Sequence, residues 1–153
     1  MADASAYNAA SELIAPNVRA GRGEKPAFID RERRLTYGEL DRETARLANF
    51  LHRLGLRREE RVALVLLDTV DFPIIFLGAI RAGIVPVPLN TLLTPEQYAY
   101  ILADTRARVA FVSEALLPAL EQARAKVPGI EFVVVGGAKA TAHRRRWSGA
   151  RAA

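Results

Sequence analysis

Two aspartates that follow an apolar run are the first residues in this sequence that could do chemistry. Asp68 and Asp71 come directly after residues 62–67, VALVLL. Nucleotide and metal sites in parallel sheets lie beyond the carboxyl ends of the strands, so either carboxylate could bind a metal ion or a ribose. The loop reads DTVDF and contains no glycine, so it lacks the fingerprint of dinucleotide-binding sites. We therefore predict that Asp71 caps the helix that follows.

A glycine-rich segment, residues 136–141 (GGAKAT), is the second candidate. It suggests a phosphate loop, but it lacks the Gly-Lys-Ser/Thr ending that places a lysine on the phosphates and a hydroxyl on magnesium. No serine lies in a G-x-S-x-G nucleophile elbow. We expect Ser113 to cap a helix and His52 to lie on the polar side of another. The sequence therefore yields no catalytic, cofactor-binding or metal-ligating residue.

The length and composition are those of one globular domain. The 153 residues are 50% hydrophobic, with no cysteine and two histidines, which excludes a disulfide framework, a thiolate metal site and a His-rich cluster. The longest apolar run, residues 72–80, is about half a membrane span, and the first residues lack the pattern of a secretory signal. We expect a cytoplasmic protein with no membrane partner.

The net charge of +5 is concentrated at the end of the chain. Residues 136–153 contain five basic residues and no acidic one, which leaves 17 of the 22 Lys and Arg against 17 Asp and Glu elsewhere. Because residues 138–153 also show no helical or strand period, we predict a folded region over residues 1–137 and a basic, disordered tail over residues 138–153. Residues 144–146 (RRR) and Trp147 could contact nucleic acid, but a solvated tail is the simpler interpretation.

Residues 61–90, RVALVLLDTVDFPIIFLGAIRAGIVPVPLN, form the centre of the predicted fold. Residues 62–67 are continuously apolar, which is typical of a parallel strand covered on both faces. Residues 72–82 are apolar nearly all round and predict a buried helix. Gly83 stands where a left-handed helix end belongs, and β-branched residues then resume. Strand, helix and strand at this spacing predict a βαβ unit.

Local signals mark the flanking elements. Thr36 with Glu39, and Thr94 with Gln97, form two capping boxes that predict helix starts, and Gly55 is placed to end the first of these helices in a Schellman motif. The remaining predictions are a helix over residues 7–20 that kinks or starts late at a proline, a hairpin over 27–36, strands over 109–113 and 132–135, and a helix over 116–126. This alternation predicts an α/β fold: a partial doubly wound, mostly parallel sheet with flanking helices.

Two stretches carry a family resemblance. Residues 35–40, LTYGEL, resemble the L-[TS]-Y-x-E-L element of the adenylate-forming, or AMP-binding, superfamily. Residues 77–90, LGAIRAGIVPVPLN, are similar to that family's L-G-x-x-x-A-G-x-V-x-x-P-x-N element, and the spacing between the two also fits. Residues 66–118 look most like benzoate- and aryl-CoA ligases. The resemblance covers roughly residues 8–135.

The resemblance implies an activity for a longer protein. Such ligases join a carboxylate to ATP, forming an acyl adenylate and pyrophosphate, and then pass the acyl group to coenzyme A. ATP, Mg²⁺ and coenzyme A are therefore implied for the full-length family, because donors and Mg²⁺ must hold the developing charge. The family's phosphate loop, magnesium ligand, ribose-binding aspartate and catalytic lysine all lie downstream of the matched region. The resemblance thus implies a truncated ligase, an N-terminal subdomain that is inactive alone.

Several interpretations of such a fragment stay open. The missing remainder of the ligase is the expected partner, or another copy through exposed apolar surface. One alternative is a stand-alone α/β interaction module that pairs with a separately encoded remainder; another is nucleic-acid binding through the basic tail. Residues 138–153 suggest an out-of-frame tail before an early stop, which the other reading frames of the encoding DNA would test.

Overall fold

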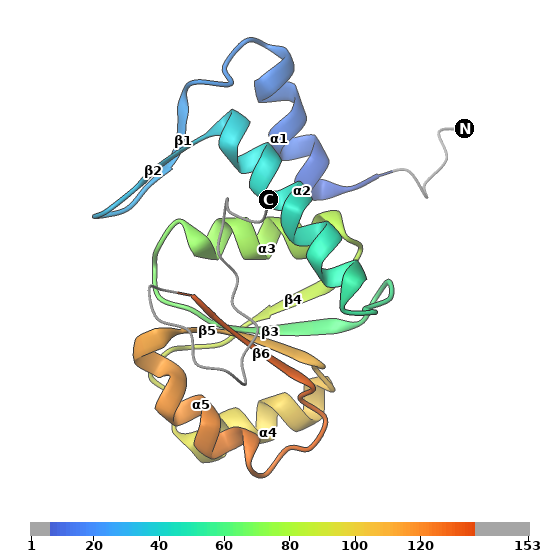
Figure 1. The fold of residues 1–153 in the computed structure, drawn as a ribbon, viewed down its shortest axis with the longest axis vertical. Helices are drawn as coiled ribbons and strands as arrows, with labels where there is room; N and C mark the ends of the chain where they lie inside the picture. The colour runs from blue at the N-terminus through green and yellow to red at the C-terminus, as the bar shows by residue number, and fades with distance from the viewer. Residues whose placement is uncertain (1–6, 137–153) are drawn as a thin grey trace. The chain divides into compact units, whose positions relative to one another are not determined.

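The protein is described here by a computed structural model of residues 7–136 (Figure 1). These residues divide into two compact units, one made of residues 7–59 and 68–84, the other of residues 60–67 and 85–136. The chain therefore crosses between the units three times. The predicted tail lies outside the described residues, so the boundary at residue 137 stays a prediction. No helix within residues 7–136 is long and apolar enough to cross a bilayer.

The first unit contains three helices and an antiparallel hairpin, as its sequence signals predicted. The elements are α1 (Ala9–Arg19), β1 (Pro26–Ile29), β2 (Arg34–Thr36), α2 (Tyr37–Arg53) and α3 (Asp71–Arg81). The capping box of α2 is confirmed, because Thr36 Oγ1 accepts from Glu39 N while Glu39 Oε2 accepts from Thr36 N. Of the two expectations for the proline in α1, the late start is not seen, because α1 begins at Ala9, after an Asn8 cap, and includes Pro16; the kink stays a prediction.

The ends of α2 and α3 follow the predicted glycine motifs. Gly55 has φ +77° and Gly83 has φ +75°, conformations that an L side chain rarely adopts. After α2, Leu56 N donates to Leu51 O at 3.2 Å, which is the long hydrogen bond of a Schellman motif. These two glycines therefore end their helices for the conformational reason that the sequence indicated.

The second unit is a four-stranded parallel sheet with two helices. Its elements are β3 (Arg61–Val65), β4 (Val85–Pro88), α4 (Pro95–Thr105), β5 (Val109–Ser113), α5 (Leu117–Arg124) and β6 (Phe132–Gly136). The strands are ordered β4-β3-β5-β6 and every neighbouring pair is parallel. The predicted α/β class, a parallel sheet with flanking helices, is therefore confirmed.

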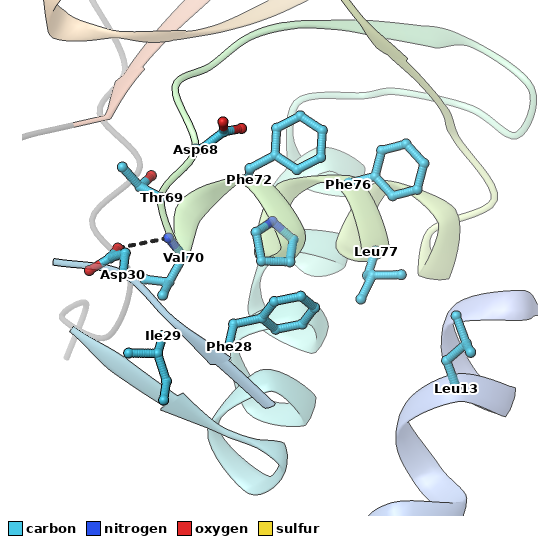
Figure 2. Close-up of a pocket in the computed structure, with 11 residues that line it drawn as sticks. Leu13, Phe28, Ile29, Asp30, Asp68, Thr69, Val70, Phe72, Phe76 and Leu77 are labelled. Atoms are coloured by element: carbon cyan, nitrogen blue, oxygen red, sulfur yellow. Dashed lines mark hydrogen bonds between the residues drawn. The ribbon is translucent and has the colours of Figure 1, made fainter. Parts of the chain in front are cut away.

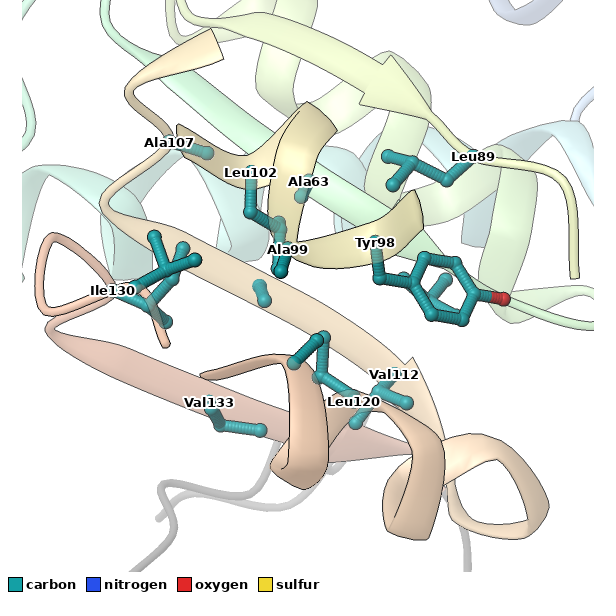
Figure 3. Packing of buried hydrophobic residues seen from close by; sticks show 14 of the residues in the cluster. Ala63, Leu89, Tyr98, Ala99, Leu102, Ala107, Val112, Leu120, Ile130 and Val133 are labelled. Atoms are coloured by element: carbon teal, nitrogen blue, oxygen red, sulfur yellow. The ribbon is translucent and has the colours of Figure 1, made fainter. Parts of the chain in front are cut away.

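A hydrophobic core lies between this sheet and α4 with α5 (Figure 3). Tyr98, Leu102 and Leu120 come from the helices and pack with strand residues such as Ala63 and Val112. The strand residues that alternate with these are buried too, among them Val62, Leu64, Phe111 and Val134. A strand that buries both sets of side chains must be apolar throughout, which is why these strands show no polar alternation.

Ser113 does not play the role that the sequence suggested. We expected it to cap a helix, but its side chain makes no cap hydrogen bond to the 3₁₀ turn that follows. Its Oγ instead accepts from Leu67 N at 2.9 Å. Leu67 lies beyond the end of β3, so its N–H needs an acceptor outside the regular ladder. Ser113 therefore joins the carboxyl ends of two neighbouring strands.

Candidate functional site

An apolar cavity of about 460 Å³ in the first unit is the candidate site (Figure 2). Its lining comes from α1, β1 and the start of α3, and includes Leu13, Phe28, Phe72 and Phe76. The rings of Phe72 and Phe76 are stacked, with centroids 5.9 Å apart and an interplanar angle of 10°. This volume falls within the usual range of small-molecule sites, which are mostly apolar with a few polar groups.

The polar groups at the cavity are Asp30, Asp68 and Thr69. The carboxylate of Asp30 is already engaged by the backbone: Oδ1 accepts from Glu32 N at 2.8 Å and from Arg33 N at 2.6 Å. Its Oδ2 accepts from Val70 N at 2.8 Å, as Figure 2 shows. These donors, the Val70 N–H first among them, lower the pKa of Asp30. Asp30 therefore holds the hairpin to the start of α3 and is unsuited to act as a base.

The predicted cap at Asp71 is wrong. The N-cap of α3 is Val70, which makes no side-chain cap bond, and Asp71 is the first helical residue. Its Oδ1 instead pairs with Arg33 Nη2 at 2.5 Å, while the N–H of Val70 donates to Asp30, forty residues earlier. Sequence rules for helix caps consider only a side chain and the backbone N–H two or three residues after it. The one sequence signal for the role of Asp30 was the charged turn over residues 30–33, because an aspartate in a turn often accepts from the backbone of its own loop.

The cavity residues provide mainly apolar contacts. Within residues 7–136, no group of three or more His, Cys, Asp or Glu side chains could hold a metal ion. Asp68 lies at the cavity, whose other carboxylate is that of Asp30. His52 is exposed on α2. Of the glycine-rich segment over residues 136–141, only Gly136 is described, at the end of β6.

Three charged residues of the second unit, Glu60, Arg108 and Glu131, form a cluster where the strands of its sheet begin. Arg108 donates to both carboxylate oxygens of Glu131 at 2.7 Å and, through Nη1, to Glu60 Oε2 at 2.9 Å. These contacts raise the pKa of Arg108 and lower that of Glu131. Because all three residues lie where strands begin, whereas ligands bind where parallel strands end, we interpret this cluster as structural.

Comparison with known proteins agrees with the fold. A family model described as "AMP-binding enzyme" matches residues 16–151. The chain is 56% identical over 131 residues to a 4-hydroxybenzoate–CoA/benzoate–CoA ligase of Rhodopseudomonas palustris, covering 86% of this chain and 24% of that protein. It is 48% identical over 132 residues to a benzoate–CoA ligase of Thauera aromatica, covering 86% of this chain and 25% of that protein.

A solved structure shows the same arrangement of elements. The benzoate CoA ligase from Burkholderia xenovorans aligns with a TM-score of 0.81 and 43% identity over 86% of this chain and 26% of that one. The chain therefore spans about a quarter of the length of these relatives. The matched family range includes residues 138–151, which we predicted to be foreign to the family; that hypothesis stays a prediction.

Proposed function

This chain belongs to the AMP-binding enzyme family, and we propose that it forms the N-terminal scaffold of a ligase that activates an aromatic carboxylic acid with ATP and transfers the acyl group to coenzyme A. The observation that carries the proposal is 56% identity, over 131 residues, to a ligase named for benzoate and 4-hydroxybenzoate. Benzoate and its 4-hydroxy derivative are therefore the substrates to test first. We place the ligase in the cytoplasm, which contains ATP and coenzyme A.

We propose further that the 153-residue chain does not catalyse adenylation alone. Forming an acyl adenylate requires donors and Mg²⁺ that stabilise the charge developing on the triphosphate. The sequence has no phosphate loop of the P-K-G type, and residues 7–136 contain no group of three or more His, Cys, Asp or Glu side chains that could hold a metal ion. The residues available are structural: Asp30 holds a helix start, Ser113 joins two strands and Arg108 binds two carboxylates. The missing groups would come from the other three quarters of such an enzyme.

The first experiment measures ATP–pyrophosphate exchange by the purified chain. Benzoate, 4-hydroxybenzoate and an aliphatic acid are each supplied with ATP and Mg²⁺, and a complete benzoate–CoA ligase serves as the positive control. We expect no exchange above the protein-free rate for any acid. Acid-dependent exchange by the chain alone would show that it contains a complete adenylation site and would contradict this part of the proposal.

The second experiment tests the scaffold itself. A chimera joins residues 8–135 of this chain to the downstream part of a homologous benzoate–CoA ligase, and the downstream part alone is the matched control. We expect the chimera to show benzoate-dependent exchange and the control to show none. A folded chimera without exchange, judged by circular dichroism and cooperative melting, would contradict the assignment of this chain as a ligase scaffold.

A further inference from the structure

The two edges of the parallel sheet differ in their backbone hydrogen-bond donors. At β4, Val85 N donates to Glu60 O and Leu89 N donates to Leu64 O, both at 2.9 Å. Because alternate residues of a strand face opposite sides, Pro86 and Pro88 present their backbone to the outer side. Proline has no N–H, so the outer edge of β4 has no donor at either position. Proline is confined to such edges for this reason.

The edge at β6 has no such protection. Phe132 N donates to Arg108 O at 3.2 Å, and the register pairs Phe132 with Val109. Phe132, Val134 and Gly136 therefore face β5, whereas Val133 and Val135 present N–H and C=O to the outer side. Among the described strands, none pairs with that side. The strand reads FVVVG, with no proline and no charge, the usual devices that prevent edge pairing.

We propose that the outer edge of β6 pairs with β6 of a second copy of this chain. In an antiparallel arrangement centred on Val134, Val133 of each copy lies opposite Val135 of the other, and each such pair exchanges two N–H···O bonds. A two-fold axis perpendicular to the sheet makes the two pairs equivalent, so four hydrogen bonds form. The result is one continuous sheet of eight strands, with α4 and α5 of both copies on the same face.

Three features favour a second copy as the occupant. The segment is β-branched and uncharged, which is the composition of strands that pair with their own kind. Its outward groups are self-complementary about Val134, so an isologous interface closes without further contacts. The prolines of β4 block the opposite edge, so pairing stops at the dimer and does not propagate into a fibre. This inference does not depend on the ligase activity.

The test combines oligomeric state with amide exchange of the natural chain. Light scattering after size exclusion, over a hundredfold range of concentration, is expected to show a monomer that becomes a dimer. Hydrogen exchange of the Val133 and Val135 amides is expected to slow as the dimer forms. The Val134 amide, which bonds to β5, should be protected at every concentration and serves as the internal control.

Variants separate backbone pairing from side-chain packing. Val135→Pro removes two of the four hydrogen bonds and is expected to weaken dimerisation roughly tenfold or more. Val135→Ala retains the N–H and controls for the lost side chain, which is buried in the core. Pro86→Ala with Pro88→Ala restores donors to β4 and is expected to produce species larger than the dimer. If Val135→Pro does not fold, the hydrogen exchange of Val133 and Val135 in the natural chain still tests whether the outer edge of β6 pairs.

Several outcomes would overturn the proposal. One is a monomer at all concentrations whose Val133 and Val135 amides exchange freely. Another is protection of these amides in the monomer, which would assign the edge to another part of the same chain. Protection that develops only when the downstream part of a homologous ligase is added would assign it to that remainder. A dimer in which these two amides stay unprotected would place the interface elsewhere.

Discussion

Gly78→Ala tests the close contact between α2 and α3, two helices within the first unit. A Cβ added at Gly78 would lie 2.6 Å from Leu47 Cδ2 and 2.9 Å from Leu47 Cβ. Carbon atoms in contact normally lie about 3.5–4.0 Å apart. A rotamer change can move Cδ2 away, but Cβ is fixed to the backbone, so the helices must separate locally by about 0.6 Å or more to restore the normal distance.

Two opposing terms set the expected free-energy change. Alanine stabilises a helix interior by about 1 kcal/mol relative to glycine. Overpacking a filled core costs about 1–3 kcal/mol, and both Gly78 and Leu47 are buried. We therefore expect Gly78→Ala to lower the free energy of unfolding by about 1 kcal/mol, within a range of about 0–2 kcal/mol. In an exposed helix, where nothing is overpacked, a Gly→Ala substitution would instead raise the free energy of unfolding.

A double-mutant cycle with Leu47→Ala isolates the contact. Leu47→Ala alone is expected to cost about 2–5 kcal/mol, because it removes a fully buried side chain. In that background Cδ2 and Cγ are gone and the cavity lets the helices shift, whereas the 2.9 Å contact with Cβ remains, so the penalty for Gly78→Ala should fall by about 1 kcal/mol without vanishing. Urea unfolding, followed by circular dichroism for all four chains, measures each term. Equal effects of Gly78→Ala in both backgrounds, or a stabilisation of about 1 kcal/mol in the natural chain, would refute the reasoning.

Three further predictions concern hydrogen bonds that the structure defines. Tyr98→Phe removes a 2.9 Å bond to a backbone carbonyl and should cost about 1 kcal/mol near pH 7. Burial raises the pKa of Tyr98, so as pH rises the unfolded chain loses the phenol proton before the folded chain does. Urea titrations should therefore show that the natural chain loses stability above about pH 10. A similar alkaline loss of stability in the Phe variant would contradict this. Thr94→Ala removes the acceptor for Gln97 N and should lower the free energy of unfolding, measured in urea, by about 0.5–2 kcal/mol. Thr94→Ser keeps a hydroxyl acceptor and should retain most of this stability; equal losses in the two variants would exclude the cap. Asp30→Asn should flatten the acid limb of the stability curve, because the lowered pKa of Asp30 contributes stability that is present above its unfolded pKa and is lost as pH falls through the folded one. The free energy of unfolding is measured between pH 5 and pH 2.5 for the natural chain and for Asp30→Asn. If it falls with decreasing pH at the same slope in both chains, this prediction is wrong.

The features that the sequence predicted correctly depend on residues close together in the chain. Thr36 reaches Glu39, and Thr94 reaches Gln97, across a single helical turn. Gly55 ends its helix because of its own backbone freedom. The apolar strands revealed a parallel sheet because both faces of each strand must be covered. The family motifs likewise lie in these local elements, which is why the resemblance is visible in the amino-acid sequence itself.

Other features depend on residues that only folding brings together. Asp30 accepts from Val70 across forty residues, and Ser113 accepts from Leu67 across forty-six. The sequence had suggested local helix caps by Asp71 and Ser113 instead. The need for glycine at position 78 arises from Leu47 on another helix. The strand order β4-β3-β5-β6 is of the same kind, since any order that buries the apolar faces would satisfy the sequence pattern.

The two edges of the parallel sheet show most clearly what the sequence determines and what the tertiary structure decides. The sequence alone determined that Pro86 and Pro88 cannot donate hydrogen bonds and that FVVVG can. The prolines by themselves favour an edge strand. Only the tertiary structure decided that β6 is the other outer strand among those described, and that the prolines face outward at β4 while Val133 and Val135 face outward at β6. The reason is physical: a donor is a property of a residue, whereas the side to which it points is set by the register with a neighbouring strand.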